Sequence, residues 1–143
     1  MSEANKELSR RFTELFSTGD EALADEILSP EAVFHGTRGD GELRGADAMK
    51  AFVAGYRRAF PDAHSTVEDQ VAEGDTVVTR WRARGTHRGQ LGPMPATDRE
   101  FEMDGVTIER IEDGRIAEVW VVRDELGLLR QLGVLPEPAH AGS

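Results

Sequence analysis

The chain has 143 residues, which suits one domain, since single domains cluster at roughly 100 to 150 residues. Its formal charge of −10 would on average repel a nucleic-acid backbone or an anionic membrane, so we expect neither as a partner. The absence of cysteine excludes disulfide bonds, thiolate metal ligands and a cysteine nucleophile. With no signal-peptide pattern and no apolar run near the roughly 20 residues that span a bilayer, a cytoplasmic location is expected.

Three helices are predicted within the first 60 residues. The first ends at Thr18-Gly19, the second begins with Asp20 as its N-cap and stops at Ser29-Pro30, and the third ends at Pro61. A short strand over residues 32–36 and a polar loop over 37–45 lie between the second and third helices. The apolar stripes that predict these helices are Leu8, Phe12, Leu15 and Phe16, then Leu23, Ile27 and Leu28, then Met49, Phe52, Val53, Tyr56 and Phe60.

From residue 66 to residue 124 the hydrophobic period changes to two, which predicts four antiparallel strands. Hairpin turns are expected at residues 72–75 and 112–115. In the third of these strands the apolar parity shifts near Gly105, which predicts a β-bulge there.

Alternation along these strands also predicts which side chains share a face. In the second strand, one face carries Val77, Thr79, Trp81, Ala83, Gly85 and His87, and the other carries Arg80, Arg82, Arg84 and Arg88. In the last strand, one face carries Ile116, Glu118, Trp120, Val122 and Asp124, and the other carries Val119, Val121 and Arg123. We interpret the arginine row as a solvated or oligomer-facing charge ladder that Glu100 and Glu102 neutralise across the sheet, rather than as a phosphate site.

The segment after the second long strand, residues 89–98, is too rich in Gly and Pro for a regular element and is expected to form the lip of a pocket. Met94 lies within it, between two prolines. A short helix rich in leucine should follow the last strand and stop at Gly133. We expect a single domain over residues 1–136 and a flexible tail over 137–143.

Helices followed by a meander predict an α+β fold. We expect a cone-shaped α+β barrel, with N-terminal helices packed on a strongly bent antiparallel sheet that encloses a pocket for a hydrophobic small molecule. The predicted outer face would expose Val119 and Val121 beside the arginine row, so a homo-oligomer, a dimer or a tetramer, is expected.

Several short motifs resemble the SnoaL-like polyketide cyclase family of the nuclear transport factor 2-like superfamily. They are residues 33–36 (Val-Phe-His-Gly), 41–45 (Gly-Glu-Leu-Arg-Gly), 59–62 (Ala-Phe-Pro-Asp), 85–89 (Gly-Thr-His-Arg-Gly) and, most specifically, 120–133, which begin Trp-Val-Val-Arg-Asp. The resemblance extends from about Leu8 to Gly133. It implies a cone with a deep pocket, a homo-oligomer packed through the outer face of the sheet, and a cofactor-free intramolecular aldol condensation that closes a ring of an aromatic polyketide.

The family's acid/base aspartate matches Asp124. A carboxylate in an apolar pocket can move a proton to or from carbon because desolvation brings its pKa toward the operating range. From spacing alone, Asp124 is instead an N-cap of the terminal helix, and the resemblance favours the catalytic role.

Other candidate site residues carry competing structural interpretations. His87 would donate to a substrate oxygen or relay a proton, or would be a hydrogen-bonded structural histidine; His35 is a second candidate for the same role. Trp81 and Trp120 would stack on a planar ring or belong to the core. The remaining candidate substrate contacts are Phe52, Tyr56, Met94 and Met103, whereas His64 and His140 suit the surface.

Two function hypotheses therefore stand. The first is a cofactor-independent cyclase or isomerase that performs acid/base, aldol-type chemistry on a polyketide-like or other hydrophobic carbonyl compound. The second is a non-catalytic module of the same fold that binds a small molecule or serves assembly. Neither hypothesis includes a metal or a nucleotide cofactor, because the four histidines lack metal-ligand spacing and no glycine-rich phosphate loop precedes a helix.

Overall fold

The computed structural model describes residues 2–36 and 41–135. The predicted tail, His140 and part of the predicted loop over 37–45 lie outside the described residues. The elements are, in chain order, α1 (Ser2–Thr18), α2 (Glu21–Ile27), β1 (Leu28–His35), β2 (Glu42–Arg44), α3 (Ala46–Ala59), β3 (His64–Glu73), β4 (Thr76–Thr86), β5 (Glu100–Glu112), β6 (Arg115–Arg123) and α4 (Glu125–Gln131). The sequence therefore predicts the helices and the four long strands, but not the short strand β2.

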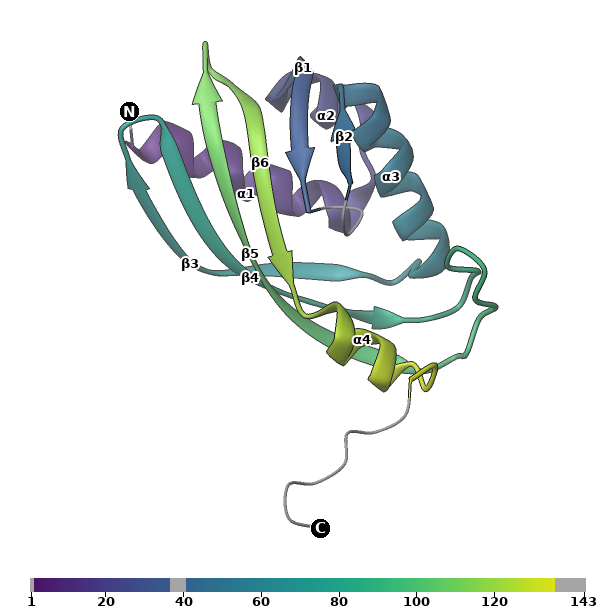
Figure 1. The fold of residues 1–143 in the computed structure, drawn as a ribbon. Coiled ribbons are helices and arrows are strands. Elements are labelled where there is room, and N and C mark those ends of the chain that lie inside the picture. Colours follow the sequence, from purple (N-terminus) through teal and green to yellow (C-terminus); the bar gives the residue numbers. More distant parts are fainter. Residues whose placement is uncertain (1, 37–40, 136–143) are drawn as a thin grey trace.

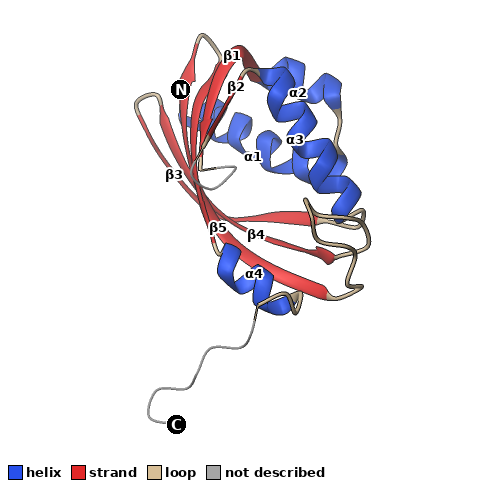
Figure 2. Cartoon of the chain, turned by 45° about the vertical axis from the view of Figure 1, so that its right-hand side comes forward, coloured by secondary structure: helices blue, strands red, loops and turns tan. Residues whose placement is uncertain are grey.

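The strands form one six-stranded sheet in the order β2-β1-β6-β5-β4-β3. The sheet bends strongly, and α1, α2 and α3 lie together on its concave side, while α4 follows β6 beside β5 (Figures 1 and 2). This is the expected α+β cone. The sheet is mixed rather than antiparallel throughout, because β1 pairs in parallel with β6.

Local sequence explains how the helices begin and end. Gly19 adopts a φ of 70° after α1, and its amide donates to the carbonyl of Leu15, so the helix ends at the predicted place. The Asp20 carboxylate then accepts hydrogen bonds from the amides of Ala22 and Leu23, which confirms the predicted N-cap of α2. None of the described helices is long and apolar enough to cross a membrane.

The hydrophobic core lies between α1, α2, α3 and the concave face of the sheet. Its fully buried side chains include Leu15 of α1, Met49 of α3 and Phe34 of β1, and the rings of Phe12 and Phe34 stack 6.2 Å apart. A second cluster at the other end of the sheet joins Phe60 to Phe101 of β5 and to Leu132 after α4. The first cluster holds the sheet against α1, α2 and α3, and the second holds it against the end of α3 and against α4.

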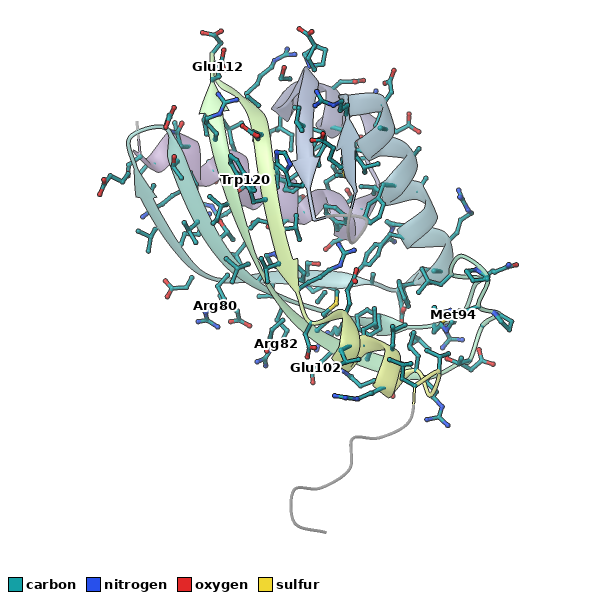
Figure 3. All side chains as sticks on the ribbon, viewed as in Figure 1. Arg80, Arg82, Met94, Glu102, Glu112 and Trp120 are labelled. Carbon is teal, nitrogen blue, oxygen red and sulfur yellow. The ribbon has the colours of Figure 1, made fainter. Side chains whose placement is uncertain are left out.

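The faces of β4 are as predicted. Val77, Thr79 and Ala83 are buried on the concave side, and Arg80 and Arg82 project from the convex side (Figure 3). The Arg82 guanidinium forms ion pairs with Asp104 at 2.9 Å and with Glu102 at 3.8 Å, and these carboxylates belong to the adjacent strand. Pairing with Glu102 confirms one of the two expected partners.

The predicted faces of β6 are wrong. Val119 is fully buried and packs in the core, whereas Trp120 is 38% exposed and Val122 is 72% exposed. Ile116 is also fully buried, because the β5–β6 register shifts between Arg110 and Ile111 and changes the parity of β6 near its start. Counting alternate residues from Ile116 therefore places the rest of the strand, from Glu118 on, on the wrong face.

The β-bulge predicted at Gly105 is also wrong. The register of β4 with β5 is continuous from Thr76 opposite Arg110 to Thr86 opposite Glu100. As a result, every second residue of β5 from Phe101 to Ile111 is buried, including Thr107 and Glu109, and Ile108 lies on the convex face.

Candidate active site

A cavity of about 750 Å³ opens between the helices and the concave face of the sheet. It lies within the range of roughly 300–1,000 Å³ that is usual for small-molecule sites. Four of the predicted substrate contacts line it: Phe52 and Tyr56 of α3, Trp81 of β4 and Met103 of β5. Different elements thus bring these side chains together, although they are up to 51 positions apart in the sequence.

Gly105 provides the space for the Trp81 side chain. The two residues are opposite each other in the β4–β5 ladder, and a Cβ atom on Gly105 would lie 2.2 Å from Cζ2 of Trp81. Real Cβ atoms essentially never approach other heavy atoms so closely. The glycine therefore lets the indole lie across the sheet as part of the cavity wall.

Two polar groups on the wall can bind a carbonyl or enolate oxygen. Burial raises the pKa of Tyr56 to about 12, so its hydroxyl stays protonated at neutral pH and can donate a hydrogen bond. Arg123 of β6 lies 5.8 Å from the centre of the Phe52 ring, and its guanidinium pairs with Glu125 at 2.6 Å. Glu125 also lines the cavity and balances the charge of Arg123, so the guanidinium acts on a bound oxygen through the hydrogen bonds that its N–H groups can donate.

Asp124 lies between two residues that line the cavity, Arg123 and Glu125. Its own side chain is exposed and is not part of the cavity wall. Its Oδ1 accepts a hydrogen bond of 2.9 Å from the amide of Gly127 and so caps α4, as spacing alone predicts. A Cβ atom at Gly127 would collide with the carboxylate, so the glycine permits this close contact.

His87 is fully buried but does not line the cavity. Its Nδ1 lies 3.0 Å from the Thr97 hydroxyl, and its ring packs 5.5 Å from the ring of Phe60. Because Phe60 itself lines the cavity, the imidazole lies behind the wall and not in it. The backbone of His87 also bonds to Asp98 and Arg99, which fastens the loop over residues 89–98 to β4.

The remaining predicted contacts lie away from the cavity. His35 Nε2 forms a hydrogen bond of 2.6 Å with Glu118, which lowers the pKa of that carboxyl, and the His35 ring stacks on Trp120 at 5.3 Å. On β1 the Phe34 side chain is fully buried, so that of His35 points to the convex face, as does that of Trp120, its partner on β6. In the loop, Gln90, Leu91 and Gly92 line the cavity, whereas Met94 does not (Figure 3).

A buried polar group beside the cavity, Glu109, is not among the residues predicted from the sequence. Glu109 of β5 is fully buried and forms a short hydrogen bond with the Ser9 hydroxyl of α1, which lies 2.6 Å from the Thr79 hydroxyl. Burial raises the pKa of Glu109 to about 7, and the hydrogen bond from Ser9 opposes this shift. The signal was the unbroken alternation of β5, which continues inward through Thr107 and Glu109.

Acidic and imidazole groups do not converge on a metal site in the part of the chain that the structure describes. No group of three or more His, Asp or Glu side chains there could hold a metal ion.

Comparison with known proteins places this fold and cavity in a family. The sequence model of the SnoaL-like polyketide cyclases matches residues 6–132. Over 142 residues, the chain is 35% identical to aklanonic acid methyl ester cyclase DauD of Streptomyces sp. strain C5, covering 95% of this chain and 85% of that protein. It is 34% identical over 119 residues to nogalonic acid methyl ester cyclase of Streptomyces nogalater, covering 82% and 89% of the two chains.

Solved structures agree with the sequence comparison. TsrD from Streptomyces laurentii superposes with a TM-score of 0.83 at 32% identity, over 92% of this chain and 96% of that chain. The chain therefore belongs to the SnoaL-like polyketide cyclase family, and its α+β cone is the fold of that family.

Proposed function

We propose that this protein is a cofactor-independent polyketide cyclase that closes a ring by an intramolecular aldol reaction on a polyketide methyl ester. The observation that carries the proposal is the cavity, whose largely apolar wall holds the Tyr56 hydroxyl and the Arg123 guanidinium. The relatives named for aklanonic and nogalonic acid methyl esters supply the substrate class.

The reaction needs one proton removed and one proton returned. A base takes a proton from the carbon next to a carbonyl, and the resulting enolate carbon forms a bond with the carbon of a second carbonyl group. The second carbonyl oxygen becomes an alkoxide and receives a proton, so no oxidant or reductant is consumed. Tyr56 and Arg123 would stabilise the negative charge on the enolate and alkoxide oxygens, since both donate hydrogen bonds from the cavity wall.

Asp124 is the proposed acid/base. It lies at the end of β6, next to the wall residue Arg123, and the family resemblance supports this role. Because this carboxylate is exposed outside the cavity wall, the role requires the reacting carbon to extend past Arg123 to the α4 end of the cavity, where the carboxylate would take the proton from carbon and return it to the alkoxide. His87 has a supporting role in this proposal, since it holds the loop whose residues Gln90 and Leu91 border the cavity.

Filling the cavity tests where the reaction occurs. Gly55 of α3 lines the cavity, and a Cβ atom there would lie 3.6 Å from the nearest atom, the Arg58 guanidinium. We expect Gly55→Phe to abolish conversion of aklanonic and nogalonic acid methyl esters, measured by liquid chromatography and mass spectrometry. Gly55→Ala is the matched control, because it leaves most of the cavity open. Replacing a glycine within a helix by alanine stabilises the helix by up to about 1 kcal/mol, so this variant should fold.

Full turnover by a folded Gly55→Phe variant would contradict a reaction in this cavity. A wild-type protein that binds these esters tightly and converts none of them would instead support the second hypothesis, a binding module of the same fold.

We further propose that the protein is a cytoplasmic homo-oligomer joined through the convex face of the sheet. Val119 and Val121 are not on this face, contrary to the prediction, because Val119 is buried in the core and Val121 lines the cavity. Exposed apolar side chains of β3, β5 and β6 cover the convex face instead. They are Val71, Ile108, Trp120 and Val122. Contiguous exposed apolar surface of this kind commonly marks an interface.

Light scattering tests the assembly. The mass in solution should be a multiple of 15.7 kDa, and Val122→Glu should reduce it to that of a monomer because a charge would be buried at the interface. A wild-type mass of 15.7 kDa at all concentrations would refute the proposal.

A further inference from the structure

Two successive inward residues on the concave face of β5 each carry an unpartnered polar atom. The Thr107 hydroxyl and the Glu109 Oε2 atom are both buried, and neither has a hydrogen-bond partner among the described residues. Buried polar groups are nearly always hydrogen-bonded, and leaving one unpaired costs roughly 1–3 kcal/mol. The pair therefore needs an explanation that the core packing does not supply.

The two residues occupy successive inward positions, one in the cavity wall and one behind it. Thr107 lines the cavity, and Glu109 follows two positions later on the same face of the strand. Helix α1 repeats this arrangement from the opposite side: Thr13 lines the cavity, and Ser9, one turn earlier, bonds to Glu109. A polar layer thus lies directly behind this part of the wall.

The surroundings of Glu109 are otherwise neutral. Its neighbours across the sheet are Val77 of β4 and Val119 of β6, both fully buried. The Ser9 and Thr79 hydroxyls complete the layer. An oxygen of Glu109 that accepts nothing from these neighbours can bond to a polar group that enters from the cavity.

We propose that Thr107 and Glu109 form a polar subsite of the cavity, which binds a hydroxyl group on an aromatic or enolic ring of the ligand. The Thr107 hydroxyl donates a hydrogen bond to the ligand oxygen, and Glu109 Oε2 accepts a hydrogen bond from the ligand hydroxyl, directly or through one water molecule. This inference rests on the proposed function for the ligand class and gives the substrate an orientation: the hydroxylated end of the ring system points toward α1 and β5.

Binding of two matched probes tests the subsite without requiring turnover. Equilibrium dialysis compares 1,8-dihydroxyanthraquinone with 9,10-anthraquinone, which lacks the hydroxyl groups. We expect the wild type to bind the hydroxylated probe at least about tenfold more tightly, the effect of one hydrogen bond to a charged group. Thr107→Val and Glu109→Gln should each remove most of this preference at pH 8.

Thr13→Val is the matched control for Thr107→Val. It also removes a hydroxyl from the cavity wall, but that hydroxyl is already bonded to the Ser9 carbonyl at 3.2 Å, so both probes should be affected alike. Melting curves show whether each variant folds. If Glu109→Gln does not fold, the result for Thr107→Val decides the test. Equal affinity of the wild type for the two probes, or a preference that survives in folded Thr107→Val, would overturn the subsite. Failure of ring closure would overturn the proposed function and leave this result standing.

Discussion

Replacing Asp124 with asparagine is expected to lower turnover by roughly 10²- to 10⁴-fold, the usual contribution of a general acid/base. The amide keeps the size of the side chain and can still accept the hydrogen bond from Gly127, but it cannot exchange a proton with substrate. Because asparagine caps helices about as well as aspartate, the melting temperature of Asp124→Asn should stay close to that of the wild type. Turnover and melting temperature are to be measured on the same preparation.

The other helix-capping aspartate provides the control. Asp20 caps α2 through the same kind of bond, from a carboxylate oxygen to backbone amides, and does not line the cavity. Asp20→Asn should therefore leave turnover unchanged. Equal turnover in Asp124→Asn and Asp20→Asn would reduce Asp124 to a cap and end its assignment as acid/base.

Replacing Glu109 with glutamine is expected to change how stability depends on pH. Burial raises the pKa of Glu109 to about 7 in the folded chain, against an ordinary value of 4.5. The folded state therefore holds the proton more tightly than the unfolded state. This difference adds about 3 kcal/mol to the free energy of unfolding. The contribution is fully present below pH 4.5 and is lost as the pH rises through 7.

Glutamine does not titrate, so Glu109→Gln escapes this loss. Relative to the wild type, its free energy of unfolding should rise by roughly 2 kcal/mol between pH 5.5 and pH 8.5, measured by urea denaturation. No charged neighbour faces Glu109 in the described structure to complicate the effect: Ser9, Val77, Thr79 and Val119 surround it. Glu14→Gln, at an exposed position of α1, should give a curve parallel to that of the wild type. If the curve of Glu109→Gln were instead parallel to that of the wild type, the pKa of Glu109 would not be raised in the folded chain.

Local patterns suffice to predict the helices and hairpins, because their signals lie within a few residues of each other. Asp20 and Gly19 mark helix ends through their own backbone and side-chain chemistry, and Gly74 and Gly114 adopt the positive φ values that their hairpin turns require. The parallel contact of β1 with β6 joins segments more than 80 positions apart, for example His35 with Trp120, and no local pattern specifies it.

The errors in the site have two physical origins: the register shift that changes the parity of β6, and the polar residues that β5 turns inward. Period-two reasoning assumes that apolar residues point inward, yet β5 turns Thr107 and Glu109 inward and leaves Ile108 on the convex face. Inward polar residues such as these break the assumption, and the proposed polar subsite lies at the same positions. Gly105 was mistaken for a bulge because the ring that needs its space, Trp81, lies on the neighbouring strand.

In the proposed reaction this cavity holds the ring system while the ring closes. A crystal structure of the protein with the cyclised product of aklanonic acid methyl ester tests it most directly. We predict that the ring system lies between Tyr56, Trp81 and Met103, with an oxygen near Arg123 and a hydroxylated edge toward Thr107. Product bound on the convex face of the sheet, with the cavity empty, would show that the ring does not close in the cavity.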